Sequence, residues 1–388
     1  MPENTSSLPL NGLRVLDFAQ FLAGPVAAMR LSDLGAEVIK IERPQGGDLC
    51  RSMVVNDQRL DGDSLVFHTF NRGKKSVAAD LKQPADLEKV RALVATADVM
   101  IHNFRPGVMD RIGLGYDAVR ELNSGLVYGA VSGYGTKGPW RDKPGQDLLV
   151  QSLSGISLLN GNADDGPTPT GFAMLDVATA GNLVQGILAS LVRRGVTGHG
   201  GLVEVDLMSS AIDLTFEQFT CFLNDHEQQP RRHETGNANP YQPAPYGVYQ
   251  TSDGWFAFAM TPLEKVADLL GSAEIGAFSQ AEAFSKLDEI KAIVAKTLVT
   301  KPVQHWLDIL EPAGVWCAPA YDWPTFVKSD GFAALDPVQT MRTTHGTEAR
   351  TTRCPIRLDG VALQNSAAAP ELGADTATVF DSLQVSRP

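Results

Sequence analysis

One aspartate occupies a position where its carboxylate could do chemistry. Asp176 comes just before residues 177–194, a stretch rich in Ala, Gly and Leu that we expect to be a long buried helix. At the start of a helix, the dipole and the unpaired amides favour an ionised carboxylate, and such a group can act as a nucleophile. The residues alone leave open that Asp176 only caps the helix.

Other reactive side chains give weaker signals. His102, His199 and His233 could titrate near neutral pH, but no two of them have metal-like spacing, so we interpret them as structural. The cysteines are far apart and form no C-x-x-C pair, which argues against a disulfide framework or a zinc site and favours reduced, mostly buried thiols; they are Cys50, Cys221, Cys317 and Cys354.

Length and charge narrow the function classes. A chain of 388 residues predicts two domains, and 43% hydrophobic with 20% charged residues is typical of a globular protein. Lys plus Arg (33) against Asp plus Glu (45) gives a net charge of −12, which argues against nucleic-acid or membrane partners. The polar start, Met1 to Pro9, predicts no signal peptide, and no apolar run predicts a membrane span.

Strand and helix signals alternate through the first half of the chain. We expect strands at residues 13–18, 37–42, 76–81, 99–102 and 126–131, with helices such as 26–34 and 85–97 between them. This alternation predicts an α/β fold with a parallel sheet. No G-x-G-x-x-G follows the first strand, and no Walker A, H-E-x-x-H or G-x-S-x-G motif occurs, so common NAD enzymes, P-loop NTPases, zincins and α/β-hydrolases are disfavoured.

The alternation of strand and helix signals ends near residue 215. Two short apolar runs flank Asp253-Gly254 and predict a hairpin, and helices are expected at about 262–271, 279–298 and 302–312. We therefore predict a large domain over 1–214, a small α+β domain over 215–330 and a C-terminal segment over 331–388 that returns to the large domain.

Several segments together resemble the class III CoA-transferase family, also called the CaiB/BaiF or formyl-CoA transferase family. They occur at regular spacing over most of the chain and include Leu10-x-Gly12-Leu13-x-Val15-Leu16-Asp17, Ala23-Gly24-Pro25, Leu34 to Glu42, Asn71 to Ser76, Asn103 to Gly107, Ser132 to Gly135 and Pro245 to Val248. The resemblance implies a Rossmann-like large domain, a smaller domain and an interlocked homodimer. It also implies a cytoplasmic enzyme with no prosthetic group, whose substrates are acyl-CoA and a small carboxylic acid.

The resemblance assigns catalytic roles. Asp176 matches the family's nucleophile, which forms a mixed anhydride and then an aspartyl-CoA thioester. Gln20 and Gln146 would offer amides to the acyl group or a developing oxyanion, and Asp147 would position the nucleophile. The racemase branch carries a histidine where this chain has Gln146, and an amide cannot exchange protons, so an acyl-CoA racemase is the disfavoured alternative. A CoA-binding protein without activity is another alternative, disfavoured by the intact Asp176.

The resemblance also assigns contacts with CoA, at positions that follow the strands of the expected sheet. These are Arg43, Asn103, Phe104, Arg105 and Arg111. Lys75 is a weaker candidate, since Lys74 and Lys75 are more typical of solvated surface. Two departures concern the acid. Leu22 replaces a frequent glutamine, and Phe258 to Pro262 lacks the family's glycine-rich loop, which favours a larger or less polar acid than formate.

Overall fold

The computed structural model describes residues 8–385, and the chain divides into two compact units. The first contains the chain up to Val150, Ala173–Ala211 and the chain from Asp336 onward, and the second contains Gln151–Phe172 and Ile212–Leu335. Residues 151–172, which the sequence assigned to the large domain, thus fold with the second unit. Most of the polar N-terminal stretch, for which the sequence predicts no signal peptide, lies outside the described residues, namely residues 1–7.

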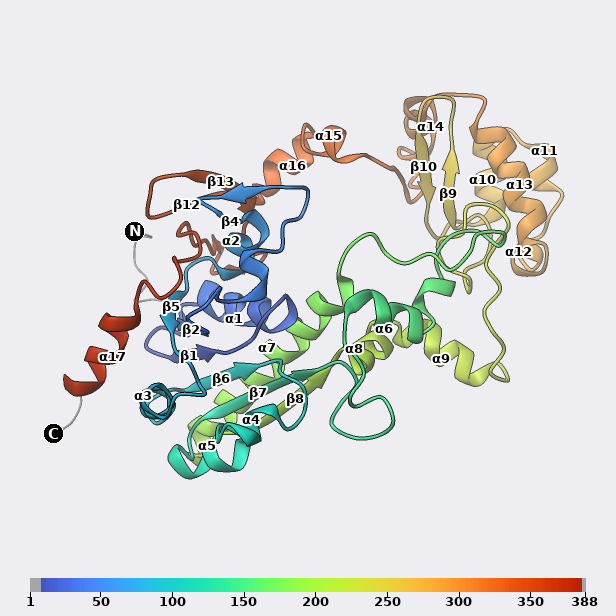
Figure 1. The fold of residues 1–388 in the computed structure, drawn as a ribbon. Coiled ribbons are helices and arrows are strands. Elements are labelled where there is room, and N and C mark those ends of the chain that lie inside the picture. The colour runs from blue at the N-terminus through green and yellow to red at the C-terminus, as the bar shows by residue number, and fades with distance from the viewer. Residues whose placement is uncertain (1–7, 386–388) are drawn as a thin grey trace. The chain divides into compact units, whose positions relative to one another are not determined.

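A six-stranded sheet in the order β5-β2-β1-β6-β7-β8 forms the centre of the first unit (Figure 1). Every neighbouring pair is parallel, which confirms the parallel sheet. The order reverses between β1 and β6, and ligands of open α/β sheets bind at the carboxyl ends of the strands at such a point. The strands are β1 (Arg14–Asp17), β2 (Glu37–Glu42), β5 (Lys75–Ala78), β6 (Val99–His102), β7 (Val127–Ser132) and β8 (Gly201–Asp206).

Helices cover both faces of this sheet, which explains why central strands such as β6 and β7 are largely apolar rather than alternating. One face packs against α1 (Ala23–Asp33) and α7 (Met174–Thr197). The other face forms a core with α3, α5 and α17, in which side chains such as Leu16 and Met100 are fully buried. The remaining helices of this unit or its borders are α2 (Leu65–Asn71), α3 (Pro84–Val94), α4 (Val108–Arg111), α5 (Tyr116–Leu122), α6 (Asp147–Leu153), α8 (Leu207–Leu214) and α17 (Thr376–Val385).

The C-terminal segment is attached to the edge strand β5. Asp375 accepts a hydrogen bond from the backbone amide of Ser76 at 2.9 Å, and the hydroxyl of Thr376 accepts one from the amide of Ala78 at 2.9 Å. These bonds occupy amides that an edge strand would otherwise expose. Short antiparallel pairs complete the unit: β3 (Arg59–Leu60) with β4 (Asp63–Ser64), β12 (Val338–Arg342) with β13 (Glu348–Thr352), and β14 (Arg357–Leu358) with β15 (Val361–Ala362).

Helix α7 differs from the expectation of a wholly buried helix. It is long and apolar enough to cross a membrane by length and composition, a test that core helices also pass. One side packs on α1, β7 and β8 and buries residues such as Leu183 and Ile187. The other side leaves Val177, Val192 and Val196 exposed by 51%, 73% and 87%. Within this unit, α7 therefore presents one buried and one uncovered apolar face.

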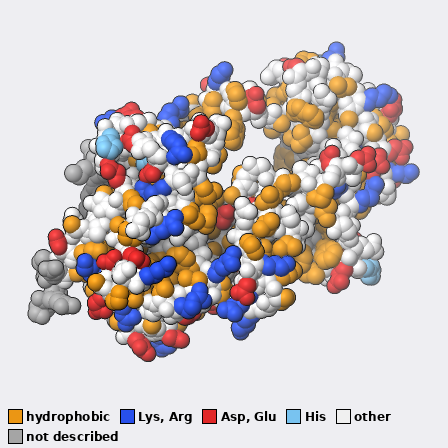
Figure 2. Space-filling model, viewed as in Figure 1, with side chains coloured by type: hydrophobic (Ala, Val, Ile, Leu, Met, Phe, Trp, Pro, Cys, Tyr) orange, Lys and Arg blue, Asp and Glu red, His pale blue; other side chains and the backbone are white. Residues whose placement is uncertain are grey.

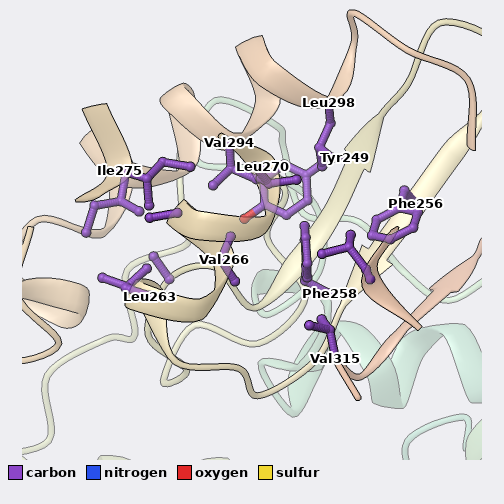
Figure 3. Packing of buried hydrophobic residues seen from close by; sticks show 14 of the residues in the cluster. Tyr249, Phe256, Phe258, Leu263, Val266, Leu270, Ile275, Val294, Leu298 and Val315 are labelled. Atoms are coloured by element: carbon purple, nitrogen blue, oxygen red, sulfur yellow. The ribbon is translucent and has the colours of Figure 1, made fainter. Parts of the chain in front are cut away.

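The second unit contains a three-stranded antiparallel sheet of β9 (Gly247–Gln250), β10 (Trp255–Phe258) and β11 (Cys317–Pro319). The hairpin around Asp253 is confirmed. Aromatic side chains of β9 and β10 pack with helical Leu, Ile and Val residues in one core (Figure 3). The expected single helix over 279–298 is wrong, because the backbone leaves helical geometry at Lys286 and separates α12 from α13. The helices are α9 (Phe216–Asn224), α10 (Leu263–Leu270), α11 (Ala273–Gly276), α12 (Glu282–Ser285), α13 (Leu287–Leu298), α14 (Val303–Leu310), α15 (Trp323–Phe326) and α16 (Asp330–Leu335).

Candidate active site

Asp176 lies in the first turn of α7, where its partly buried carboxylate faces the start of α1. The backbone amide of Ala23, the first residue of α1, donates a hydrogen bond to this carboxylate. Burial raises the pKa of Asp176 to about 7, the nearby charge of Asp147 adds to the rise, and the Ala23 amide opposes it. The expectation that the helix dipole simply holds Asp176 ionised is therefore wrong, because this carboxyl titrates near neutral pH.

Asp147, rather than Asp176, caps α7. Its Oδ2 accepts hydrogen bonds from the backbone amides of Leu175 at 2.7 Å and Asp176 at 3.0 Å. The N-cap residue itself, Ala173, has no side chain that could accept them. A buried carboxylate at this position takes up two amides that would otherwise lack partners and interacts favourably with the helix dipole. Asp147 thus fixes the backbone that carries the Asp176 side chain.

Two glycines bring Asp147 to this place. Gly133, which follows β7, and Gly145 approach so closely that a Cβ added at Gly133 would lie 2.5 Å from the Cα of Gly145. Only glycine allows this backbone contact. It brings the segment that leads into α6 to the carboxyl end of β7, with Gln146 exposed and Asp147 buried beneath it.

Gln20 belongs to the loop that joins β1 to α1. Its backbone amide donates to Oδ1 of Asn103 at 2.8 Å, and its carbonyl accepts from Nδ2 of Asn103 at 2.5 Å. Asn103 directly follows β6, so this pair of bonds spans the point where the strand order reverses. The next residue, Phe21, has φ of +62°, a left-handed conformation that is costly for an aromatic residue.

A network of buried charges supports the same loop. Nζ of Lys40 donates to the Ala19 carbonyl at 2.7 Å and pairs with Asp48 at 2.8 Å. Nζ of Lys74 pairs with Asp17 at 2.8 Å, and Oδ1 of Asp17 accepts the Ala19 amide at 3.0 Å. Lys74 is therefore fully buried, which corrects its interpretation as a solvated surface residue; burial lowers its pKa to about 8, although Asp17 opposes that effect.

Cys50 is the other potential nucleophile near Asp176. Burial, together with the charges of Asp48 and Asp176, raises the pKa of its thiol to about 12, against the opposing effect of Lys40. A thiol, unlike a thiolate, is a poor nucleophile, so Cys50 does not compete with Asp176. Cys50 and Cys354 are buried as expected, whereas Cys317 is partly exposed and Cys221 exposed.

A cavity of about 200 Å³ opens at the carboxyl ends of β1, β2 and β5. Gln20, expected near the acyl group, lines it together with Arg43 and Phe104, expected as CoA contacts. Nε of Arg43 donates to the Gly47 carbonyl at 2.9 Å, and no carboxylate of the described chain pairs with its guanidinium. Lys82 also lines the cavity and was missed, although it directly follows an expected strand, as Arg43 does.

Two further cations lie beside Gly107, close to α4. The guanidinium groups of Arg111 and Arg141 would come within 3.6 and 3.8 Å of a Cβ built on Gly107. Arg141 was not recognised in the sequence, because it belongs to a loop without strand or helix signals. Two adjacent cations that have no ion-pair partner in the part of the chain described here are suited to an anion.

The remaining candidates lie elsewhere or make no contact with this cavity. Arg105 is exposed and does not line it. Lys75 begins β5 and pairs with Glu37, the first residue of β2. It therefore lies at the amino ends of the parallel strands, opposite the cavity. His102 is buried, and burial lowers its pKa to about 4, so it is neutral at physiological pH.

Comparisons with known proteins identify the family. The model of CoA-transferase family III matches residues 10–376. Succinate–glutarate CoA-transferase of Agrobacterium fabrum is 32% identical over 97% of this chain and 96% of its own. Acetyl-CoA:oxalate CoA-transferase of Acetobacter aceti is 34% identical over 81% of both chains.

A solved structure agrees over nearly the full length. The crystal structure of a CaiB/BaiF family protein from Brucella suis has a TM-score of 0.83 and 31% identity and covers 97% of this chain and 99% of its own. The resemblance noted in the sequence is thereby confirmed. This chain belongs to CoA-transferase family III and is a transferase enzyme.

Proposed function

We propose that this enzyme moves CoA from an acyl-CoA donor, such as succinyl-CoA, to a small organic acid, with Asp176 as the nucleophile. The observation that carries the proposal is the carboxylate of Asp176, which the Ala23 amide orients and whose pKa of about 7 leaves a large ionised fraction at neutral pH. The raised pKa also makes this carboxylate more basic, and hence more nucleophilic, than a free aspartate.

The reaction proceeds in balanced steps. An oxygen of Asp176 attacks the thioester carbonyl, the C–S bond breaks, and a mixed anhydride and the CoA thiolate form. The thiolate then attacks the aspartyl carbonyl, which releases the donor acid and leaves an aspartyl-CoA thioester. The acceptor carboxylate repeats both steps in reverse. The side-chain amides of Gln20 and Gln146 are proposed to donate hydrogen bonds to the oxyanions that form when each carbonyl is attacked. Amides that are already in place before the reaction stabilise such oxyanions best.

The cavity at the carboxyl ends of β1, β2 and β5 is proposed to hold part of CoA. The support is chemical: CoA carries phosphates, and Arg43 and Lys82 line a cavity that also has the apolar wall of Phe104. Arg111 and Arg141 provide two further cations beside α4. Arg105 remains a candidate for a CoA contact near this wall, whereas the position of Lys75 gives it no support.

Arg43→Ala is expected to weaken CoA binding about tenfold, because a charge-assisted bond to phosphate contributes roughly 1.5 kcal/mol or more. Isothermal titration calorimetry with CoA measures this, and the loss should shrink at high salt. Arg91→Ala is the matched control, because that guanidinium also donates to a backbone carbonyl, of Gly113, but does not line this cavity. Equal affinity in all three proteins would exclude Arg43 from the CoA site.

The acceptor is proposed to be a dicarboxylic acid. The named substrates of the two relatives, glutarate with succinate and oxalate, are all dicarboxylic acids. A racemase of the same fold is disfavoured because Gln146, beside Asp147, cannot exchange protons. Exchange of the α-proton of an acyl-CoA in deuterated water, without transfer of CoA, would favour the racemase instead.

We further propose that a second copy of this chain covers the uncovered face of α7 in a cytoplasmic homodimer. Val192 and Val196 on that face are 73% and 87% exposed. Exposed apolar side chains that recur along one face of a helix are typical of a surface that another protein covers. Figure 2 shows apolar and charged side chains interspersed on one face of the molecule. Sedimentation velocity should give the dimer mass, and a monomer at micromolar concentration contradicts the proposal.

The experiment that tests the transfer itself is intact-protein mass spectrometry. After mixing with succinyl-CoA or acetyl-CoA, the wild type should gain the mass of CoA less one water through a hydroxylamine-sensitive bond, and Asp176→Ala should not. Glutarate or oxalate should then discharge the adduct as the new acyl-CoA. If both proteins bind CoA and neither forms an adduct with any donor, the covalent mechanism is wrong.

Gly145→Ala is expected to lower kcat/KM about tenfold, because an added Cβ 2.4 Å from the Cα of Gly133 displaces the segment that positions Asp147. Steady-state kinetics and Tm measure the effect. Gly166→Ala is the control, since its Cβ would meet no atom within 4 Å. A normal rate in Gly145→Ala would show that the placement of Asp147 does not matter for turnover.

A further inference from the structure

The loop between β1 and α1 brings an amide to the nucleophile. Ala23, whose N–H donates to the Asp176 carboxylate, comes directly after this loop. Before it, Phe21 has φ of +62°, which an aromatic residue adopts only where its surroundings impose it. The position of the Ala23 amide therefore depends on whatever holds the loop in this unfavourable conformation.

Buried side chains hold the residues that precede Phe21. The amide and the carbonyl of Ala19 are bound by Asp17 and Lys40, both almost fully buried. The amide and the carbonyl of Gln20 are both bound by one carboxamide, that of Asn103. Among these side chains, Asn103 is the one that follows β6. Its carboxamide uses both its donor and its acceptor on the backbone of Gln20.

We propose that Asn103 is a positioning residue that clamps the Gln20 backbone and thereby holds the Ala23 amide on the carboxylate of Asp176. This differs from the direct CoA contact that the family resemblance suggested for Asn103. It rests on the proposed function, in which Asp176 is the nucleophile. Without the clamp, the loop relaxes from the left-handed conformation at Phe21, and Asp176 loses its bond from Ala23.

Asn103→Ala tests this role, with Asn103→Leu as a second variant that keeps the side-chain volume. Each should lower kcat/KM about tenfold and move the acidic limb of its pH profile upward by about one pH unit, the effect of one lost backbone bond on a carboxylate. The affinity for CoA, measured by calorimetry, should stay within about twofold of the wild type.

Asn123→Ala is the matched control. The Asn123 carboxamide also binds backbone groups on both its donor and acceptor sides, at Val94, Ala97 and Gly125, but just before the amino ends of β6 and β7. It should lower Tm and leave the pH profile unchanged. A tenfold loss of CoA affinity in the Asn103 variants with an unmoved acidic limb would overturn the proposal and make Asn103 a CoA contact.

A readout without activity separates this inference from the proposed function. The pH dependence of the Tm difference between each protein and its Asp176→Asn version reports the pKa of Asp176. If the wild type transfers no CoA but Asn103→Ala still raises that pKa, the clamp stands and the transfer function fails. If transfer occurs and the pKa does not move, the clamp alone is wrong.

Discussion

Asp176→Asn should lower CoA transfer by about three orders of magnitude or more and, at pH 8, make the protein more stable than the wild type. The first effect follows from loss of the nucleophile, because an amide cannot form the anhydride. The second follows from the raised pKa. The folded protein holds a proton on Asp176 up to about pH 7, whereas the unfolded chain releases it near the ordinary value of 3.8.

The sign of the stability effect depends on pH. Between about pH 4 and 7 the folded state binds the extra proton, so the stability contributed by Asp176 falls as the pH rises and is lowest above pH 7. A rise of the pKa from 3.8 to about 7 corresponds to an upper bound of about 4 kcal/mol. The Tm of Asp176→Asn should therefore exceed that of the wild type at pH 8 and equal it near pH 4.

Asp206→Asn is the control for this measurement. Asp206 is, like Asp176, a partly buried carboxylate. It ends β8, and its oxygens accept hydrogen bonds from the amide and hydroxyl of Ser209. Its replacement should bring no gain in Tm at pH 8. If Asp176→Asn is no more stable than the wild type at any pH, the fold does not disfavour the charged form of Asp176.

The sheet could be predicted from sequence because its strands contain short groups of buried apolar residues separated by turn and helix signals. Residues 13–18 and 37–42 are largely buried, although the second segment also buries the charged Lys40 and Glu42. The break at Lys286 could not be predicted in this way. Residues 279–298 keep an apolar pattern compatible with helix throughout, and the turn depends on tertiary packing.

Parts of the candidate site could be proposed from sequence, and the signal differs by residue. Asp176 and Arg43 follow signals in their own neighbourhood, a helix start and a strand end. Lys75 was misplaced although its position carried a signal: it precedes the expected strand 76–81, and the end of a parallel strand that binds ligands is the carboxyl end. Lys82 at the other end of β5 lines the cavity instead.

Contacts between distant segments carry no local signal at all. The bond between Asp147 and the amide of Asp176 joins residues that are 29 positions apart. Those between Asn103 and Gln20 join residues 83 positions apart. The raised pKa of Asp176 depends on such contacts and on burial, and so a sequence-based argument from the helix dipole alone gave the wrong direction.

Asp147→Ala should lower kcat/KM about a hundredfold, while Asp147→Asn should keep most of the rate and move its pH profile to lower pH. Alanine leaves the amides of Leu175 and Asp176 without their acceptor, which costs about 1–3 kcal/mol and displaces the first turn of α7. Asparagine retains an oxygen for these amides and removes only the charge.

The acidic limb of the pH profile separates the two roles of Asp147. In the wild type, activity should fall as the pH drops through about 7, because protonated Asp176 cannot attack. The charge of Asp147 contributes to that value, so Asp147→Asn should lower it and give a higher fraction of maximal activity at pH 6 than the wild type has. Initial rates from pH 5 to 9 measure this. An acidic limb at the same pH in both proteins would mean that burial alone sets the pKa of Asp176, and that Asp147 acts only as the cap of α7.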